Sequence, residues 1–320
     1  MRVLLLILIA MLAPPAYALT LLNESWQLQV PGGTLHGSLL LPKSDAPLPV
    51  ALLIAGSGPT DRNGNNPQGH NDSLKRLAQA LAKQGVASLR YDKRGVGASR
   101  AVAPKEEQLR LDDYVSDAVA WAARLKADPR FGALVLIGHS EGALIASLAE
   151  SQAQPDALIS LAGSGRRIDA LLREQLQGRL PPSLLASASY LIDELVAGRR
   201  HAAVPDALQV LFRPSVQPYL ISLFAQDPAT AFARTTAPAL ILQGTHDIQV
   251  SPTDARALQQ ARPDASLALI EGMNHVLRIV PMDGPSQAAS YNRAELPIVQ
   301  ALAPRIAQFL AQHGLLPPSS

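Results

Sequence analysis

The sequence predicts an α/β fold in which a mostly parallel, twisted sheet is flanked by helices and carries a helical cap insertion. Two observations lead to this prediction. Six short runs are apolar at nearly every position, which is typical of strands buried on both faces of a parallel sheet. Helical patterns separate most of these runs, and such alternation of strand and helix indicates a doubly wound sheet.

The first two strands differ from the others because they alternate apolar and polar residues. Residues 26–30 and 34–41 do so on either side of Pro31-Gly32-Gly33, which predicts a β-hairpin with one solvated face. The six apolar strands are then expected at residues 50–54, 87–91, 133–137, 157–161, 239–242 and 267–270. Helices are expected at residues 72–83, 112–125 and 143–150.

The regular alternation stops between residues 166 and 235, which predicts an insertion. Helix-like runs at residues 171–176 and 184–196 are separated by prolines and a glycine, and no buried strand pattern appears. Helices inserted between two strands would form a cap, which leaves residues 19–165 and 236–320 as the core. Five of the thirteen aromatic residues lie in this cap, either as its own small core or as the lining of an apolar pocket: Tyr190, Phe212, Tyr219, Phe224 and Phe232.

Residues 1–18 have the features of a signal peptide. Arg2 supplies a positive charge, residues 3–13 form an apolar run, and Ala16-Tyr17-Ala18 matches a cleavage pattern after two prolines. The run is shorter than the ~20 residues that span a bilayer, and the alternative interpretation is an uncleaved anchor. The sequence therefore predicts a periplasmic or secreted protein that begins at Leu19 and has no stable membrane span after cleavage.

Composition excludes several kinds of chemistry. The absence of cysteine rules out disulfides, thiolate metal sites and a cysteine nucleophile. The 28 basic and 26 acidic residues form no basic cluster, so nucleic-acid binding is not expected. No metal-binding histidine motif is present, and Gly95-x-Gly97 lacks the third glycine of a dinucleotide fingerprint. We therefore expect neither a metal nor a cofactor.

The strongest catalytic signal is Gly138-His139-Ser140-Glu141-Gly142, a G-x-S-x-G motif. A buried strand runs directly into it, and a helix rich in small residues follows. Such a turn forces the serine into a strained backbone conformation, and side chains at the two glycine positions would collide with neighbouring elements. The hydroxyl of Ser140 would then lie above the sheet, at a helix N-terminus that stabilises negative charge. Ser140 is therefore the candidate nucleophile.

A serine nucleophile requires a base, and the chain has seven histidines. Six of them are set aside because of their positions. One lies in the G-x-S-x-G turn itself, and the others lie on the hairpin, in the insertion, in the C-terminal helix, in a polar loop or directly beside an aspartate. His275 follows the last apolar strand, where a loop would carry it over the carboxyl edge of the sheet. Its position, and the elimination of the others, make His275 the candidate base.

The acid that orients the base is expected at the end of a neighbouring strand. Asp247 follows the strand at residues 239–242, and the chain order Ser140, Asp247, His275 is the one expected on this kind of sheet. Glu271 is the second candidate, because it is close to the histidine loop. Asp264 precedes its strand and so belongs to the wrong edge of the sheet.

An oxyanion hole is expected from two backbone N–H groups. One belongs to Glu141, directly after the nucleophile, and the other to the loop after residues 50–54, where Ser57 is the candidate. Glycines on both sides of Ser57 allow this backbone to approach a substrate carbonyl. The polar segment at residues 61–65 would brace the hole or shape the substrate entrance.

Together these residues resemble the α/β-hydrolase superfamily. The resemblance covers residues 50–313 and rests on the loop at residues 56–62, the turn at residues 91–99, the Ser140 elbow and the Asp247/His275 pair. The turn at residues 91–99 is similar to the D-x-R-G-x-G-x-S turn of this superfamily, where it is structural. The chain looks most like secreted bacterial esterases and serine-aminopeptidase-like hydrolases, which share a cap. Ala55 departs from the histidine-glycine pair of many lipases, which argues against a true lipase.

The sequence thus predicts a serine hydrolase that cleaves carboxylic esters of small or medium acyl chains through an acyl-enzyme intermediate, with a small-molecule acyl substrate as its partner. An aminopeptidase, an amidase or an acyltransferase on the same triad is an alternative. A non-catalytic binding protein with this fold is the alternative from another class. An aminopeptidase would need an acidic pocket for the substrate ammonium, for which Asp193 or Glu194 of the cap is a candidate.

Overall fold

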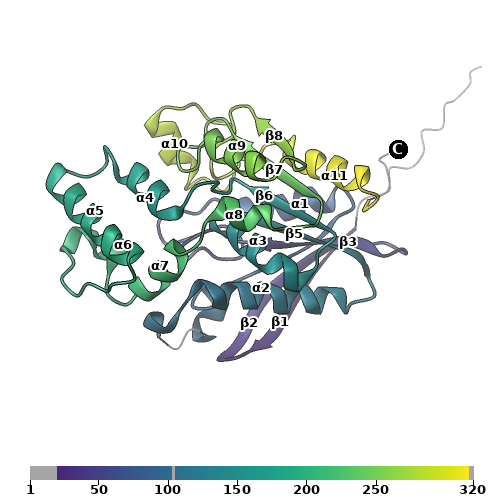
Figure 1. Ribbon diagram of the computed structural model, residues 1–320. Coiled ribbons are helices and arrows are strands. Elements are labelled where there is room, and N and C mark those ends of the chain that lie inside the picture. The colour runs from purple at the N-terminus through teal and green to yellow at the C-terminus, as the bar shows by residue number, and fades with distance from the viewer. Residues whose placement is uncertain (1–19, 103–104, 317–320) are drawn as a thin grey trace, which may run out of the picture.

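An eight-stranded sheet organises the computed structural model, which describes residues 20–102 and 105–316 (Figure 1). The predicted signal peptide lies outside these residues. The strands are β1 (Leu21–Val30), β2 (Gly33–Pro42), β3 (Leu48–Ile54), β4 (Ala87–Tyr91), β5 (Phe131–His139), β6 (Ala157–Leu161), β7 (Ala239–Gly244) and β8 (Ser266–Ile270). Their order across the sheet is β1-β2-β4-β3-β5-β6-β7-β8.

The pairing of the strands confirms the predicted mostly parallel sheet. β1 and β2 form the expected antiparallel hairpin, and β2 also pairs antiparallel with β4. The strands from β4 through β3 to β8 are all parallel to their neighbours. Parallel strands end at the same edge of a sheet, so the loops after β3, β5, β7 and β8 meet there.

Helices cover both faces of the sheet and extend beyond one edge. The α-helices are α1 (Ser73–Ala82), α2 (Leu111–Lys126), α3 (Glu141–Ala153), α4 (Ile168–Leu176), α5 (Pro182–Val196), α6 (Gln209–Phe212), α7 (Gln217–Phe224), α8 (Pro228–Ala233), α9 (Pro252–Ala261), α10 (Gly284–Ser290) and α11 (Leu302–Gln312). Three short 3₁₀ turns are η1 (Gly97–Val102), η2 (Glu106–Gln108) and η3 (Asp206–Leu208). None of the helices in the described parts of the chain combines the length and the apolar character needed to cross a membrane.

The central strands send alternate side chains into two hydrophobic cores. Leu52 and Ile54 of β3 belong to the core shared with α2, α3 and α9, whereas Ala51 and Leu53 belong to the core shared with α1 and α11. Because both faces are covered, most positions of these strands are apolar. This burial explains why the sequence of the central strands does not alternate.

The turn after β4 is fixed by buried charges. Asp92 accepts hydrogen bonds from the Arg62 guanidinium and from the backbone N–H of Ala98, each at 2.8 Å. Arg94 donates to Asp117 of α2 at 2.7 Å. Both side chains of this turn are therefore occupied in holding the loop after β3 and the helix α2 against the sheet. Lys93, which lies between them in the sequence, instead faces the Gly56 carbonyl and the start of α3.

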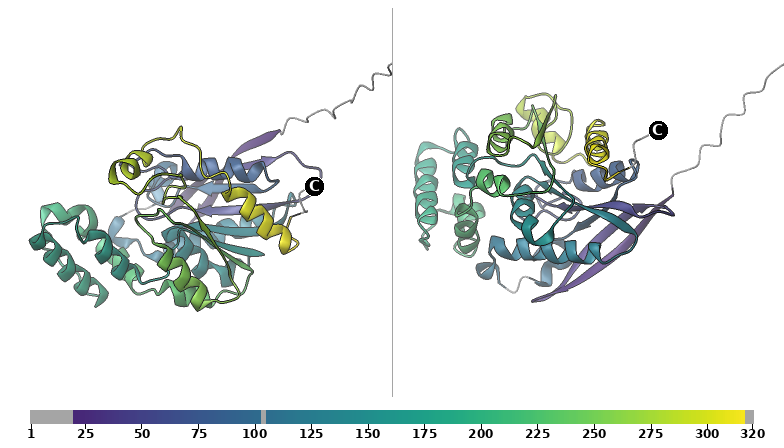
Figure 2. Two further views of the ribbon diagram at one scale, coloured as in Figure 1. Left: turned by 90° about the horizontal axis from the view of Figure 1, so that it is seen from above. Right: turned by 45° about the vertical axis from the view of Figure 1, so that its right-hand side comes forward.

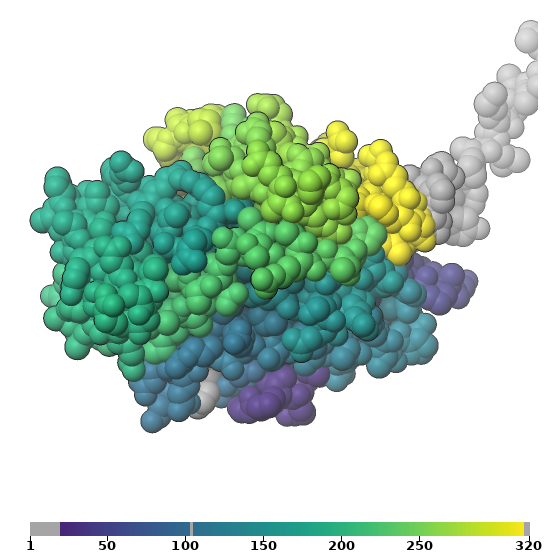
Figure 3. Space-filling model, in the orientation of Figure 1, coloured from purple at the N-terminus to yellow at the C-terminus, as the bar shows by residue number. Residues whose placement is uncertain are grey.

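The insertion between β6 and β7 contains the helices α4 to α8. In Figures 1 and 2, α4 to α7 lie at one end of the molecule, beyond the carboxyl edge of the sheet, with α11 at the other end. Figure 3 shows the same helices as a lobe on the surface. The last helix, α8, instead packs on α3 and α9 of the core. The insertion therefore starts and ends on the sheet and extends over the edge where the candidate residues lie.

Candidate active site

Ser140 lies in a sharp turn between β5 and α3. Its backbone angles are φ 56° and ψ −123°, a conformation that costs an ordinary residue about 1–3 kcal/mol. A Cβ atom on Gly138 would overlap the carbonyl oxygen of Gly142, and a Cβ atom on Gly142 would overlap that of Ile54. These two contacts explain why the motif requires glycine at both positions. They also press the first turn of α3 against the end of β3.

His275 and Asp247 form a buried pair at the carboxyl edge of the sheet. The Nδ1 of His275 lies 2.8 Å from Oδ2 of Asp247, and both residues are about 95% buried. The other carboxylate oxygen accepts the backbone N–H groups of Gln249 and Val250 at 2.8 and 2.9 Å. Burial alone would raise the pKa of Asp247, but the charge and hydrogen bond of His275 and these two N–H groups keep that pKa below its ordinary value. Asp247 is therefore ionised and oriented toward the imidazole.

The rival carboxylates make no such contact. Glu271 is exposed, and its nearest histidine nitrogen is that of His246, at 4.0 Å. Asp264 is also exposed and pairs with Arg262 at 3.2 Å. Of the three carboxylates considered from the sequence, the structure brings only Asp247 to His275.

Ser140 and His275 line one small cavity, which we call the polar cavity. It measures about 90 Å³ and is also lined by His139 and by uncharged polar residues from three segments, the β3–α1 loop with the start of α1, the β7–α9 loop and the end of α10: Ser57, Thr60, Asn66, Asn71, Ser73, Gln249 and Tyr291. Sequence analysis did not identify Gln249 or Tyr291. The sequence contains only a weak indication of these two residues, because each lies in a loop whose path cannot be predicted from the sequence.

His139 packs against the candidate base. The centres of the two imidazole rings are 4.9 Å apart, and the Nε2 of His139 donates to the backbone carbonyl of His275 at 2.9 Å. Burial and the neighbouring positive charge of His275 lower the pKa of His139 from 6.5 to about 4. His139 therefore remains neutral and holds the backbone of the histidine loop.

The two candidate oxyanion donors come from adjacent segments. Glu141 is the first residue of α3, so its N–H group belongs to the exposed positive end of that helix. Ser57 follows Gly56, where a built Cβ atom would lie 3.0 Å from the Cβ of Ser140. The loop after β3 therefore runs directly past the candidate nucleophile, and both Ser57 and Glu141 line the space beside Ser140.

A buried lysine connects these two segments, and the sequence analysis did not identify it. The Lys93 ammonium donates to the carbonyl of Gly56, which belongs to the same peptide group as the Ser57 N–H. It also lies 3.9 Å from Oε1 of Glu141 and 5.1 Å from the centre of the Tyr114 ring. Burial lowers the pKa of Lys93, and the Glu141 carboxylate partly opposes this effect. The signal in the sequence was a lysine two residues after a fully buried strand.

A larger cavity, which we call the cap cavity, lies between Ser140 and the insertion. It measures about 330 Å³ and is lined mainly by apolar side chains of α4, α6 and α7, including Ile168, Leu171, Leu172, Leu211, Leu220 and Phe224. Phe212 is fully buried elsewhere in the insertion and does not line it. Both interpretations of the cap aromatics therefore hold, for different residues: Phe212 belongs to the core of the insertion, and Phe224 lines the apolar pocket.

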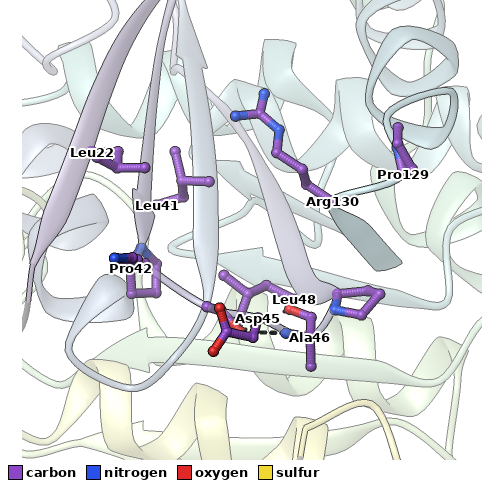
Figure 4. Close-up of a pocket in the computed structure, with 11 residues that line it drawn as sticks. Leu22, Leu41, Pro42, Asp45, Ala46, Leu48, Pro129 and Arg130 are labelled. Carbon is purple, nitrogen blue, oxygen red and sulfur yellow. Dashed lines mark hydrogen bonds between the residues drawn. The ribbon is translucent and has the colours of Figure 1, made fainter.

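Another cavity of about 320 Å³ lies at the opposite edge of the sheet (Figure 4). It is formed by the end of β2 and the segments that precede β3 and β5, and Arg130 lies beside it. The Arg130 guanidinium pairs with Glu24 at 2.6 Å and with Asp128 at 2.8 Å. None of the candidate catalytic residues lines this cavity. Nor do the described residues include a cluster of three or more potential metal ligands.

Comparisons with known proteins agree with this architecture. A family model described as serine aminopeptidase, S33 (Hydrolase_4) matches residues 68–279. Esterase EstD of Thermotoga maritima is 26% identical over 263 residues, which cover 80% of this chain and 61% of the relative. The chain thus spans about three-fifths of that relative's length.

Solved structures with similar folds include Est1E from Butyrivibrio proteoclasticus and a proline iminopeptidase from Mycobacterium smegmatis. Est1E has a TM-score of 0.58 and 17% identity, covering 90% of this chain and 98% of Est1E. The iminopeptidase has a TM-score of 0.58 and 18% identity, with 91% and 99% coverage. These likenesses show the fold.

The pKa of His139 generates a prediction about stability. An unfolded chain binds a proton at this histidine below pH 6.5, whereas the folded protein does so only near pH 4, so stability is lost as the pH falls through this window. The loss corresponds to roughly 3 kcal/mol at its acid end. We expect the free energy of unfolding, measured by urea titration with tryptophan fluorescence, to fall more steeply between pH 7 and pH 4 in the wild type than in His139→Gln. Parallel curves for the two proteins would contradict this expectation.

Proposed function

The chain belongs to the serine aminopeptidase, S33 family of hydrolases, and from this premise we propose that it is a serine carboxylesterase. The family match confirms the resemblance that the motifs indicated. The observation that carries the proposal is the buried Asp247–His275 pair, which meets Ser140 at one cavity on the carboxyl edge of an α/β-hydrolase sheet.

In the proposed reaction, the Oγ of Ser140 attacks the ester carbonyl carbon while the Nε2 of His275 takes its proton. Asp247 holds the opposite ring nitrogen and stabilises the imidazolium that forms. The N–H groups of Ser57 and Glu141 stabilise the negative charge on the carbonyl oxygen. The imidazolium then protonates the departing alcohol, and a water molecule activated by His275 hydrolyses the acyl-enzyme. The second step releases the acid and restores the Ser140 hydroxyl.

The charges around the site favour an ester over the substrate of an aminopeptidase. The two candidate carboxylates for binding an ammonium group are paired on the surface, Asp193 with Arg173 and Glu194 with Arg199. Neither lines the cavities beside Ser140. Among the described residues, Glu141 is the one carboxylate on the wall of the cap cavity, and the Lys93 ammonium already faces it. Esterase EstD, the curated relative, supports the same choice.

The cap cavity is suited to an acyl chain. Its walls are mostly aliphatic and aromatic, so each methylene group that enters it is removed from water. Its volume of about 330 Å³ also limits the length that fits. We therefore assign small and medium acyl chains to this cavity and propose a small-molecule acyl ester as the substrate. The proposed mechanism uses no metal and no cofactor.

We also propose that the protein acts in the periplasm or outside the cell. Arg2, the apolar run at residues 3–13 and Ala16-Tyr17-Ala18 support this proposal, as does the absence of cysteine. A signal peptidase would remove residues 1–18 and leave Leu19 as the first residue. Protein recovered from the periplasm or the medium should therefore have the intact mass of a chain that begins at Leu19. Full-length protein in the membrane fraction would refute the proposal.

The triad generates a prediction about turnover. Ser140→Ala should lower kcat for a p-nitrophenyl ester on the order of 10⁴-fold or more without changing the unfolding curve, because it removes the nucleophile. Asp247→Asn should also lower kcat by several orders of magnitude, because the histidine loses its orienting charge. Glu271→Gln is the matched control and should stay near the wild-type rate, since Glu271 is exposed and does not contact His275.

Two results would count against this assignment. Stoichiometric labelling of Ser140→Ala by a fluorophosphonate would identify another nucleophile. A larger loss in Glu271→Gln than in Asp247→Asn would transfer the role of the acid to Glu271.

The cap cavity generates a prediction about acyl length. Each added methylene should raise kcat/KM by up to about fourfold, from ~0.8 kcal/mol per buried CH₂, until the cavity is full, after which kcat/KM should fall. Phe224→Ala should move the optimum to longer chains, because Phe224 lines the cavity. Phe212→Ala should lower stability by about 3–5 kcal/mol without moving the optimum, because Phe212 is buried elsewhere. Rates that are flat across p-nitrophenyl esters would show that the insertion does not enclose the acyl chain.

A further inference from the structure

Two cavities meet at Ser140, and they differ in which catalytic residue they contain. Ser140 and Ser57 line both the cap cavity and the polar cavity. His275 lines the polar cavity but does not line the cap cavity. The nucleophile and the loop of the oxyanion hole therefore stand at the boundary between the two, while the base faces only one of them.

The reaction requires the departing alcohol oxygen to lie within reach of the base. A general acid must be within hydrogen-bond distance of the atom that it protonates, about 2.6–3.2 Å. When an ester carbonyl is at Ser140, its alcohol side must therefore extend into the cavity that His275 lines. The acyl side then extends the other way, into the cap cavity. The position of His275 thus assigns the two halves of the ester to the two cavities.

We propose that the polar cavity is the alcohol subsite of this enzyme and that it accepts a small, neutral, hydroxylated alcohol such as a three-carbon diol. This inference rests on the proposed esterase function and goes beyond it, because it defines the leaving group. The proposal follows from the polarity, the charge and the size of the cavity.

The polarity is that of hydroxyl and amide groups with unused hydrogen-bonding capacity. The Tyr291 hydroxyl accepts a hydrogen bond from Nε2 of Gln249 at 2.7 Å, which leaves its own proton available as a donor. Burial raises the pKa of Tyr291 to about 12, so this proton is retained at neutral pH. The side-chain oxygen of Asn66 accepts the N–H of Gln68 at 2.9 Å, while its amide nitrogen has no partner in the described chain. A hydroxylated alcohol would form hydrogen bonds with both groups. An alkyl alcohol would displace water from the half-buried Tyr291 hydroxyl and leave it unpaired, whereas the amide of the exposed Asn66 would stay hydrated.

The cavity contains no permanent charge. No Asp, Glu, Lys or Arg is among the described residues that line it. His139 is neutral, and the other histidine of the lining, His275, is the proposed catalytic base. An alcohol that carries an ammonium or a phosphate group would find no counter-charge here and would lose its hydration. The cavity therefore selects for a neutral alcohol.

The size of the cavity limits the alcohol to a few heavy atoms. Its volume of about 90 Å³ is about a quarter of the 330 Å³ of the cap cavity, so the alcohol is the smaller half of the ester. A three-carbon chain with hydroxyl groups is consistent with this space. A large aromatic or long-chain alcohol would have to extend out of the cavity.

The test compares esters that share one acyl group and differ in the alcohol. Propyl butyrate, 2,3-dihydroxypropyl butyrate and butyrylcholine are followed by acid release in a pH-stat with the full-length mature protein. We expect kcat/KM for the dihydroxypropyl ester to exceed that for the propyl ester by about tenfold, which corresponds to one or two hydrogen bonds that the propyl ester cannot make. Butyrylcholine should be the poorest of the three.

Two variants connect this preference to the cavity. Tyr291→Phe removes one donor and should lower the dihydroxypropyl-to-propyl ratio about three- to tenfold. Asn66→Asp keeps the oxygen that accepts the Gln68 N–H but adds a negative charge, so it should raise the butyrylcholine-to-dihydroxypropyl ratio several-fold. Tyr190→Phe is the matched control, because this exposed tyrosine of α5 lies outside both cavities and should leave both ratios unchanged.

The possible failures are distinguishable. If none of the three esters is hydrolysed, nor any p-nitrophenyl ester, the proposed function itself is wrong. If the propyl and dihydroxypropyl esters are hydrolysed equally well, or if butyrylcholine is preferred, the esterase stands and the alcohol subsite is wrong. A diol preference that survives unchanged in Tyr291→Phe and Asn66→Asp would also overturn the assignment to this cavity.

Discussion

The contact between α3 and the end of β3 is the constraint on which the rest of the site depends. Because Gly138 and Gly142 lack side chains, backbone meets backbone at this point, and the first turn of α3 rests on the carbonyl of Ile54. This packing holds Ser140 in its strained conformation and places it beside the loop that follows β3. The candidate nucleophile and both candidate oxyanion donors are thus positioned by one contact between main-chain atoms, which has little freedom to relax.

The sequence was sufficient to predict the sheet and the edge at which the candidate residues meet, for identifiable physical reasons. β4 and β6 were predicted with their observed bounds because central strands are mostly apolar and do not alternate. Ser140, Asp247 and His275 could be proposed because each follows a strand, and parallel strands end at one edge. Sequence position does not give the depth or direction of a side chain, and for this reason Lys93 and Tyr291 were missed. Phe212 and Phe224 are equivalent in the sequence, and only tertiary packing separates the buried core residue from the cavity wall.

The two cavities beside Ser140 have different structural origins. The cap cavity owes most of its wall to the insertion, whose helices α4, α6 and α7 supply apolar side chains. The polar cavity is built by loops of the core, which include the segment with His275 and the segment with Ser57. The insertion and the core loops therefore contribute to opposite sides of Ser140. A change in the insertion alters one wall while the candidate base keeps its supports.

Lys93 has a consequence for how this protein could be re-engineered. Its ammonium is almost fully buried, and it faces the Gly56 carbonyl, the Glu141 carboxylate and the Tyr114 ring. A transplanted loop that moved the Gly56 carbonyl would remove one of these partners. The buried Lys93 ammonium would then lack a hydrogen-bond acceptor, which would lower the stability of the fold by several kcal/mol. Three segments therefore depend on one another: the loop after β3, the turn after β4 and the start of α3. In an exchange between homologous proteins, they should be transferred together or left intact.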